Sequence, residues 1–81
     1  MKKLQFTDLI LFENDRVVVV NKPPMLSSLD ERFADAPSVL RMAKAYHPDL
    51  RLCHRLDKET SGALILAKDD ETYRFISMEF E

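Results

Sequence analysis

Glycine and cysteine are almost absent from this chain of 81 residues, which contains one of each, Gly62 and Cys53. A single cysteine excludes an internal disulfide and suits a reducing compartment, so we expect a cytoplasmic protein. An average composition would supply roughly five or six glycines. The one glycine is therefore expected where the backbone needs a positive φ or a close approach.

Long apolar runs are missing too. Runs such as residues 9–12 and 17–20 are far too short to cross a bilayer, and no membrane association is expected. Asp8 interrupts the N-terminal segment too early for the apolar core of a signal peptide. With 46% apolar and 32% charged residues, the composition is that of one small globular domain.

The chain also lacks a strong excess of positive charge. Its net charge of −2 argues against a tight, sequence-independent grip on nucleic acid. The charge is uneven, however, because residues 36–58 carry five basic and two acidic side chains while both flanking segments are net negative. A basic patch and an ordinary solvated surface are both compatible with this clustering.

The apolar pattern predicts an α+β chain that opens with a β-hairpin. Strands are expected at residues 9–13 and 16–21, joined by a turn at 14–15. The second strand contains four consecutive valines, which is typical of burial on both faces. Lys22 ends this strand, before two prolines, and could therefore lie near the polar loop at residues 57–62, but a solvent-facing lysine is the favoured interpretation.

Further along, the sequence predicts a loop over residues 25–36 and a helix that starts within 35–38. Pro48 should end this helix at His47. A short strand at 51–54, a polar loop, a buried strand at 63–67 and a last helix follow. Asp69 or Asp70 should cap the last helix, whose apolar stripe would hold Tyr73, Ile76 and Phe80. The sequence stops inside that helix, so residues 1–81 are interpreted as part of a domain that is truncated on its C-terminal side.

The chemistry is concentrated in residues 54–62, HRLDKETSG, a polar loop between two apolar strands. Asp57 lies between the cations Arg55 and Lys58, and its carboxylate could act as a nucleophile or a base. On local features alone an ordinary surface aspartate is the alternative. The guanidinium of Arg55 suits a phosphate, a carboxylate or a base, or makes a structural ion pair.

Two other site types fit the sequence less well. His54, Asp57 and Ser61 could form a hydrolase triad, but no G-x-S-x-G segment is present. One cysteine and two histidines are too few for a structural zinc site, so no metal is expected. Cys53 then reads as a small buried apolar residue, and His47 as a helix C-terminal residue.

The loop resembles a known family signature. HRLDKETSG followed by ALILAK is similar to the HRLDxxTSG motif of RluA-type pseudouridine synthases, and ILFENDRVVVVNKP resembles that family's opening hairpin. The resemblance implies the mixed, largely antiparallel pseudouridine synthase fold. It also implies isomerisation of uridine in structured RNA, either 23S ribosomal RNA or tRNA, without a cofactor. It makes Asp57 the catalytic residue, with Arg55, His54 and Thr60 as substrate-binding residues and Arg55 paired with Asp57.

The chain departs from the family pattern in two places. Met25 stands where relatives have glycine. The family's tyrosine in a K-x-Y segment and a later basic residue have no match, and Tyr73 is expected on the wrong side of its helix. The 81 residues alone are therefore expected to be inactive, with apolar surface open to self-association. A catalytically silent RNA- or protein-binding remnant is the alternative, and a small α/β hydrolase using Ser61 or Asp57 is a weaker third.

Overall fold

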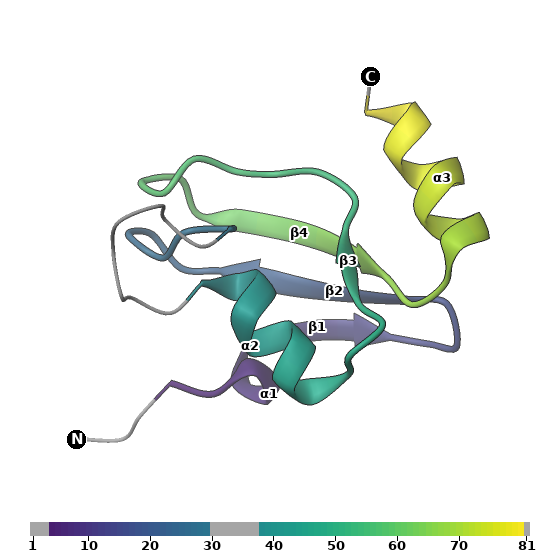
Figure 1. Cartoon of the computed structure of the whole chain (residues 1–81). Helices are drawn as coiled ribbons and strands as arrows, with labels where there is room; N and C mark the ends of the chain where they lie inside the picture. Colours follow the sequence, from purple (N-terminus) through teal and green to yellow (C-terminus); the bar gives the residue numbers. More distant parts are fainter. Residues whose placement is uncertain (1–3, 30–37, 81) are drawn as a thin grey trace.

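The computed structural model describes residues 4–29 and 38–80. The elements in chain order are α1 (Phe6–Leu9), β1 (Ile10–Glu13), β2 (Val17–Lys22), α2 (Val39–Tyr46), β3 (Arg51–Leu52), β4 (Gly62–Ala67) and α3 (Asp70–Glu79). Within this described part, the strands form one antiparallel sheet in the order β1-β2-β4-β3 (Figure 1). The predicted α+β class and opening hairpin are confirmed.

The two central strands, β2 and β4, supply the core. Val18 lies opposite Leu66, and Val20 lies opposite Leu64. Because strand side chains alternate, these four residues share one face, and all four are fully buried against α1 and α2 (Figure 1). The intervening valines of β2 stay partly exposed. The predicted burial of this strand on both faces is wrong, because α1 and α2 cover only one face.

Helix boundaries follow the capping residues that the sequence offers. The Ser38 side chain accepts a hydrogen bond from the Arg41 N–H at 3.1 Å, and Asp69 accepts one from the Thr72 N–H at 2.7 Å. His47, just before a proline, is extended at φ −152° and ends α2. These predicted ends are confirmed. Residues 30–37, which include part of the predicted loop and helix start, lie outside the described residues.

A short helix precedes the first strand and was not predicted. The Gln5 N–H donates to the Asp8 carboxylate at 3.1 Å, and the Asp8 N–H donates to the Gln5 carbonyl at 3.0 Å. This local turn directs Phe6 and Leu9 into the core. The first strand therefore begins at Ile10, one residue later than expected.

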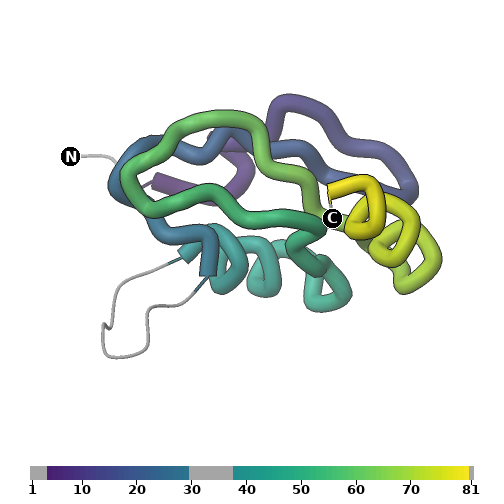
Figure 2. Tube along the Cα trace, turned by 90° about the horizontal axis from the view of Figure 1, so that it is seen from above, coloured from purple at the N-terminus to yellow at the C-terminus, as the bar shows by residue number. Residues whose placement is uncertain are grey.

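Helix α3 stands at the side of the sheet, apart from α1 and α2 (Figures 1 and 2). None of its residues is buried, and Phe75, Met78 and Phe80 are exposed. A ten-residue helix is marginal in water without tertiary contacts, so the side chains that anchor it matter. Arg51 provides one anchor, an ion pair with Asp70 at 2.7 Å. Among the described helices, none is both long and apolar enough to span a membrane.

Two residues near the end of the sheet have positive φ. Gly62 has φ 147°, which confirms the backbone role predicted for the only glycine. Met25 has φ 69°, in the left-handed region that non-glycine residues rarely adopt. Its N–H donates to the Lys58 carbonyl at 2.7 Å, which holds it there. The strain at Met25 gives a physical reason for the glycine that the resembled family has at this position.

Met25→Gly should increase the free energy of unfolding by up to about 1 kcal/mol. The left-handed conformation costs a side-chain-bearing residue roughly 1–2 kcal/mol, and the extra chain entropy of glycine offsets part of that gain. The Met25 side chain is 64% exposed, so little packing is lost. Met25→Ala is the matched control, because it removes the side chain but keeps the Cβ. Urea denaturation in which both variants gain equally would contradict the strain argument.

Candidate active site

The register of β2 and β4 brings two loops together, the loop after β2 and the loop before β4. Lys22 ends β2 and lies opposite Gly62, which begins β4. Residues 23–29 and 53–61 therefore leave the sheet at the same end. Beyond β3 the pairing continues, because the Cys53 N–H donates to the Ile65 carbonyl at 3.0 Å. The HRLD segment therefore belongs to the long connection between β3 and β4, and the sheet holds both ends of this connection.

Lys22 joins these two loops from inside the protein. Its side chain is fully buried, and Nζ donates to the carbonyls of Leu26 at 2.6 Å, Lys58 at 3.0 Å and Pro23 at 3.2 Å. The favoured interpretation of a solvent-facing lysine is wrong, and the alternative that Lys22 lies near the polar loop is confirmed. Burial lowers the pKa of Lys22, while the negative charges of Glu59 and Asp57 act in the opposite direction.

The position of Lys22 could have been inferred from strand alternation. Lys22 continues the inward row of Val18 and Val20, two residues further along β2. An ammonium at such a position needs acceptors, because a buried charge without partners is costly. The chain meets this need with backbone carbonyls of the two loops.

Ser28 makes a second link between the loops. Its side chain is nearly buried, and Oγ donates to the Leu56 carbonyl at 2.8 Å and accepts from the Leu56 N–H at 3.1 Å. The Thr60 N–H donates to the Asp57 carbonyl at 3.0 Å and closes a turn. The backbone is therefore held on both sides of Asp57. Nothing in the sequence singled out Ser28.

A pocket of about 850 Å³ lies between these loops and α3. It is lined by Ser27, Ser28, Leu29, Cys53, His54, Arg55, Leu56, Asp57, Lys58, Tyr73, Ser77 and Phe80. The structure thus brings together three of the four predicted site residues. The fourth, Thr60, is exposed and is not a lining residue. Within the described chain, Arg55 and Asp57 share the pocket without an ion pair between them.

One wall of the pocket comes from α3, through Tyr73, Ser77 and Phe80. The expectation that Tyr73 lies on the wrong side of its helix is wrong, because Tyr73 lines the same pocket as Asp57. The Phe80 ring stacks on His54 with centroids 4.0 Å apart. The Ser77 Oγ is buried and has no hydrogen-bond partner among the described residues. The spacing of these three residues is helical, but the sequence did not show which face of α3 meets the loop.

His54 is a structural part of the loop. Its Nε2 accepts a hydrogen bond from the Ile65 N–H at 3.1 Å, which in a neutral imidazole leaves the proton on Nδ1. Burial lowers the pKa of His54. Because its acceptor nitrogen is already used, His54 is not available as a base for Ser61. The hypothesis of a hydrolase triad, which needs His54 as the base, therefore loses its main support.

Cys53 is buried beneath the loop, as predicted, and burial raises the pKa of its thiol. A thiol of this kind is a poor nucleophile and a poor metal ligand. Across residues 4–29 and 38–80, no three histidine, cysteine or acidic side chains gather into a metal-binding group. The ionisable groups that line the described pocket are those of the HRLD segment, Lys58 and Tyr73, together with the Cys53 thiol.

Comparison with known proteins adds to this geometry. Residues 16–81 match the family model described as RNA pseudouridylate synthase. The chain is 36% identical to the dual-specificity RNA pseudouridine synthase RluA of Vibrio parahaemolyticus, over 89% of this chain and 29% of the relative. It is 35% identical to the ribosomal large subunit pseudouridine synthase C of Rickettsia typhi, over 85% of this chain and 23% of the relative.

A solved structure agrees with these sequence relatives. Human RNA pseudouridylate synthase domain containing 4 superimposes with a TM-score of 0.73 at 32% identity, covering 93% of this chain and 30% of that one. The chain spans less than a third of the length of each of these relatives.

Lys22→Met should lower the free energy of unfolding by about 1–3 kcal/mol, because the hydrogen bonds of its ammonium to three partly buried carbonyls are lost. Removal of the desolvated charge offsets part of this loss. Lys44→Met is the matched control, since Lys44 is exposed and contacts one carbonyl at 3.3 Å. Urea denaturation should place the control within about 0.5 kcal/mol of the parent. Equal losses in both variants would show that the three bonds of Lys22 contribute nothing.

The stability of the protein should fall as the pH is lowered from about 6.5, where an unperturbed histidine titrates. The folded-state pKa of His54 is lowered, so the unfolded chain takes up the proton first and unfolding is favoured below that pH. His54→Phe should be less stable at neutral pH but show a flatter dependence between pH 7.5 and 5. Urea midpoints measured across this range test both points. A variant whose profile runs parallel to that of the parent would exclude His54 as the source.

Proposed function

The chain belongs to the RNA pseudouridylate synthase family, and we propose from this premise that the protein isomerises uridine to pseudouridine in RNA with Asp57 as the catalytic carboxylate. The observation that carries the proposal is the position of Asp57. It projects from a loop whose backbone is held on both sides, into a pocket that it shares with Arg55 and His54. The proposed substrate is 23S ribosomal RNA or tRNA.

The reaction breaks the N1–C1′ bond of uridine and rejoins the ring to the sugar through C5. The C5 proton is lost and N1 gains a proton, so atoms and charge balance without a redox partner. An ionised carboxylate beside the sugar can attack C1′ or take a proton from C2′. Asp57 is the acidic residue that lines the described pocket, and it suits either route.

The remaining residues act on the substrate in this proposal. The target base must leave its stack, at a cost of a few kcal/mol. Arg55 is exposed at the pocket, and its planar guanidinium can fill the vacated space or bind a phosphate. His54, stacked on Phe80, forms an aromatic wall. Thr60 closes the turn after Asp57 and, because it does not line the pocket, would contact only a part of the substrate that lies outside it.

A second candidate is RNA binding without turnover by these 81 residues. It is favoured by the exposure of Asp57 and by the loosely anchored α3 wall. A carboxylate that faces water lacks the preorganised surroundings that supply most of an enzyme's rate enhancement. Residues 1–81 would then be one part of a catalytic domain that acts in the cytoplasm. In this case the isolated chain binds RNA and forms no pseudouridine.

Asp57→Asn should reduce pseudouridine formation at least about a thousandfold and leave RNA binding intact, because the shape is kept and the charge is lost. The assay is tritium release from 5-labelled uridine in separate 23S ribosomal RNA and tRNA transcripts. It uses the protein expressed from its complete reading frame, with residues 1–81 in parallel. Asp49→Asn is the matched control, because Asp49 is an exposed aspartate outside the pocket. Turnover that survives in Asp57→Asn would overturn the assignment.

A further inference from the structure

We propose that a second, smaller pocket beside Asp57 binds the nucleotide next to the target uridine on the same RNA strand. This pocket has a volume of about 420 Å³. It is lined by Leu29, Leu40, Lys44, Arg51, Leu52, Cys53, His54, Arg55 and Tyr73. The inference rests on the proposed function, since it adds a flanking subsite to the pocket that contains Asp57.

The two pockets adjoin each other. His54, Arg55 and Tyr73 are among the residues that line both. A chain that enters the Asp57 pocket therefore passes these three side chains on its way into the smaller pocket. A single strand of RNA meets this requirement, because its neighbouring nucleotides are covalently joined.

The charge of the smaller pocket suits a phosphate. Lys44, Arg51 and Arg55 are its charged side chains, and none of its described lining residues is acidic. Arg51 pairs with Asp70 at 2.7 Å, but their side chains are 52% and 65% exposed. An exposed pair of this kind contributes little, so a phosphate can compete for Arg51. The Lys44 Nζ contacts a carbonyl at 3.3 Å, a long bond that a phosphate oxygen would improve.

The same pocket offers a surface for a base. The Arg51 guanidinium carbon lies 5.5 Å from the centroid of the Tyr73 ring, and Leu40 and Leu52 supply apolar surface beside them. Bases of single-stranded nucleic acids stack on aromatic rings and guanidinium planes while cations follow the backbone, without reading the sequence. Tyr73 and Arg51 together provide this combination.

An acidic peptide is the competing occupant, because carboxylates also bind arginine and lysine. Continuity with the Asp57 pocket and the aromatic wall favour the nucleotide. The basic excess of residues 36–58, which the sequence left open between a binding patch and chance, is explained in part by Lys44, Arg51 and Arg55. The chain as a whole remains acidic, so the attraction is local.

Binding of a uridine pentanucleotide to the 81-residue chain, followed by NMR titration at two salt concentrations, tests the pocket. Tyr73→Leu should weaken binding at least about fivefold, whereas Tyr73→Phe should stay near the parent because the ring is kept. Arg51→Gln should weaken binding and make the slope of log affinity against log salt shallower by about 0.7. Arg51→Lys should retain that slope.

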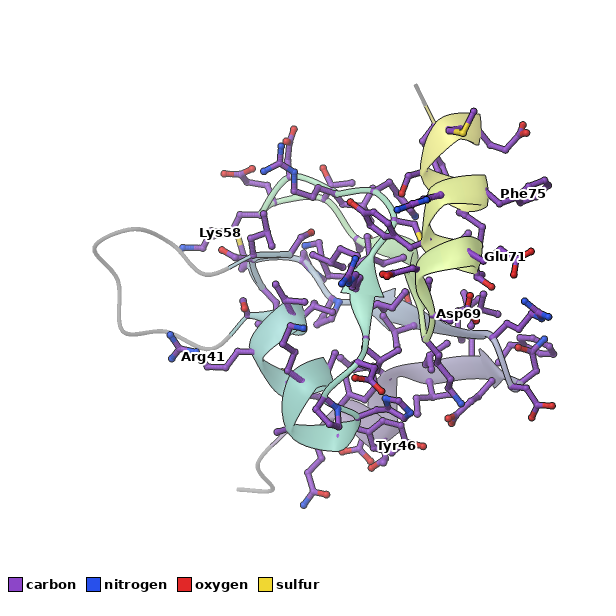
Figure 3. The ribbon with its side chains drawn as sticks, turned by 45° about the vertical axis from the view of Figure 1, so that its right-hand side comes forward. Arg41, Tyr46, Lys58, Asp69, Glu71 and Phe75 are labelled. Atoms are coloured by element: carbon purple, nitrogen blue, oxygen red, sulfur yellow. The ribbon has the colours of Figure 1, made fainter. Side chains whose placement is uncertain are left out.

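Two controls lie on α3, outside both pockets. Arg74→Gln removes one positive charge, and Phe75→Leu removes one ring that points away from the sheet (Figure 3). Both should bind within about twofold of the parent. The proposal is overturned if Arg51→Gln loses no more than Arg74→Gln and Tyr73→Leu loses no more than Phe75→Leu. It is also overturned if a glutamate pentapeptide binds as tightly as the RNA and depends on the same residues.

The outcomes separate this inference from the proposed function. Pseudouridine formation that persists in Asp57→Asn removes the catalytic assignment, and the pocket stands if Arg51→Gln and Tyr73→Leu still weaken RNA binding. Formation that requires Asp57, with pocket variants that bind like the controls, removes the pocket alone. In the active protein, Arg51→Gln should raise KM and leave kcat unchanged.

Discussion

The buried ammonium group of Lys22 is the constraint on which the site depends. It is held by carbonyls from two loops that are far apart in the sequence and adjacent only because β2 and β4 pair. If either loop moved away, the ammonium would lose hydrogen bonds to its backbone acceptors, which costs free energy. The loop that carries Asp57 is therefore tied to the sheet from within, although Asp57 itself is exposed.

The pocket has two walls of very different rigidity. The loop wall is fixed by Lys22 and by Ser28, both of which are buried. The α3 wall contains no buried residue and is attached by exposed ion pairs and by the stack of Phe80 on His54. A ligand that presses on the pocket would therefore displace α3 before it displaced Asp57. Such a pair of walls would suit a site in which the Asp57 carboxylate stays in place while the α3 wall adapts to substrates of different shape.

Local signals in the sequence were sufficient for much of the fold. The hairpin, the cap Asp69 and the helix end at His47 depend on neighbouring residues and could be predicted, whereas Ser38 was not singled out as the cap of α2. The expected burial of β2 on both faces failed because coverage of a sheet is decided by where distant helices pack. The end of a buried strand allowed Lys22 to lie near the polar loop, but its burial depends on acceptors from two loops whose positions the sequence does not show. The pocket face of α3 could not be predicted, since its orientation depends on how the chain leaves β4.

The pairing of β2 with β4 also sets an order of events during synthesis of the chain. Lys22 is made early, but Gly62, which lies opposite it, and the Lys58 carbonyl are made much later. Every residue that lines the pocket follows β2 in the chain, and Tyr73, Ser77 and Phe80 also follow β4. The pocket around Asp57 is therefore complete only when β2 has paired with β4 and the α3 segment has followed them.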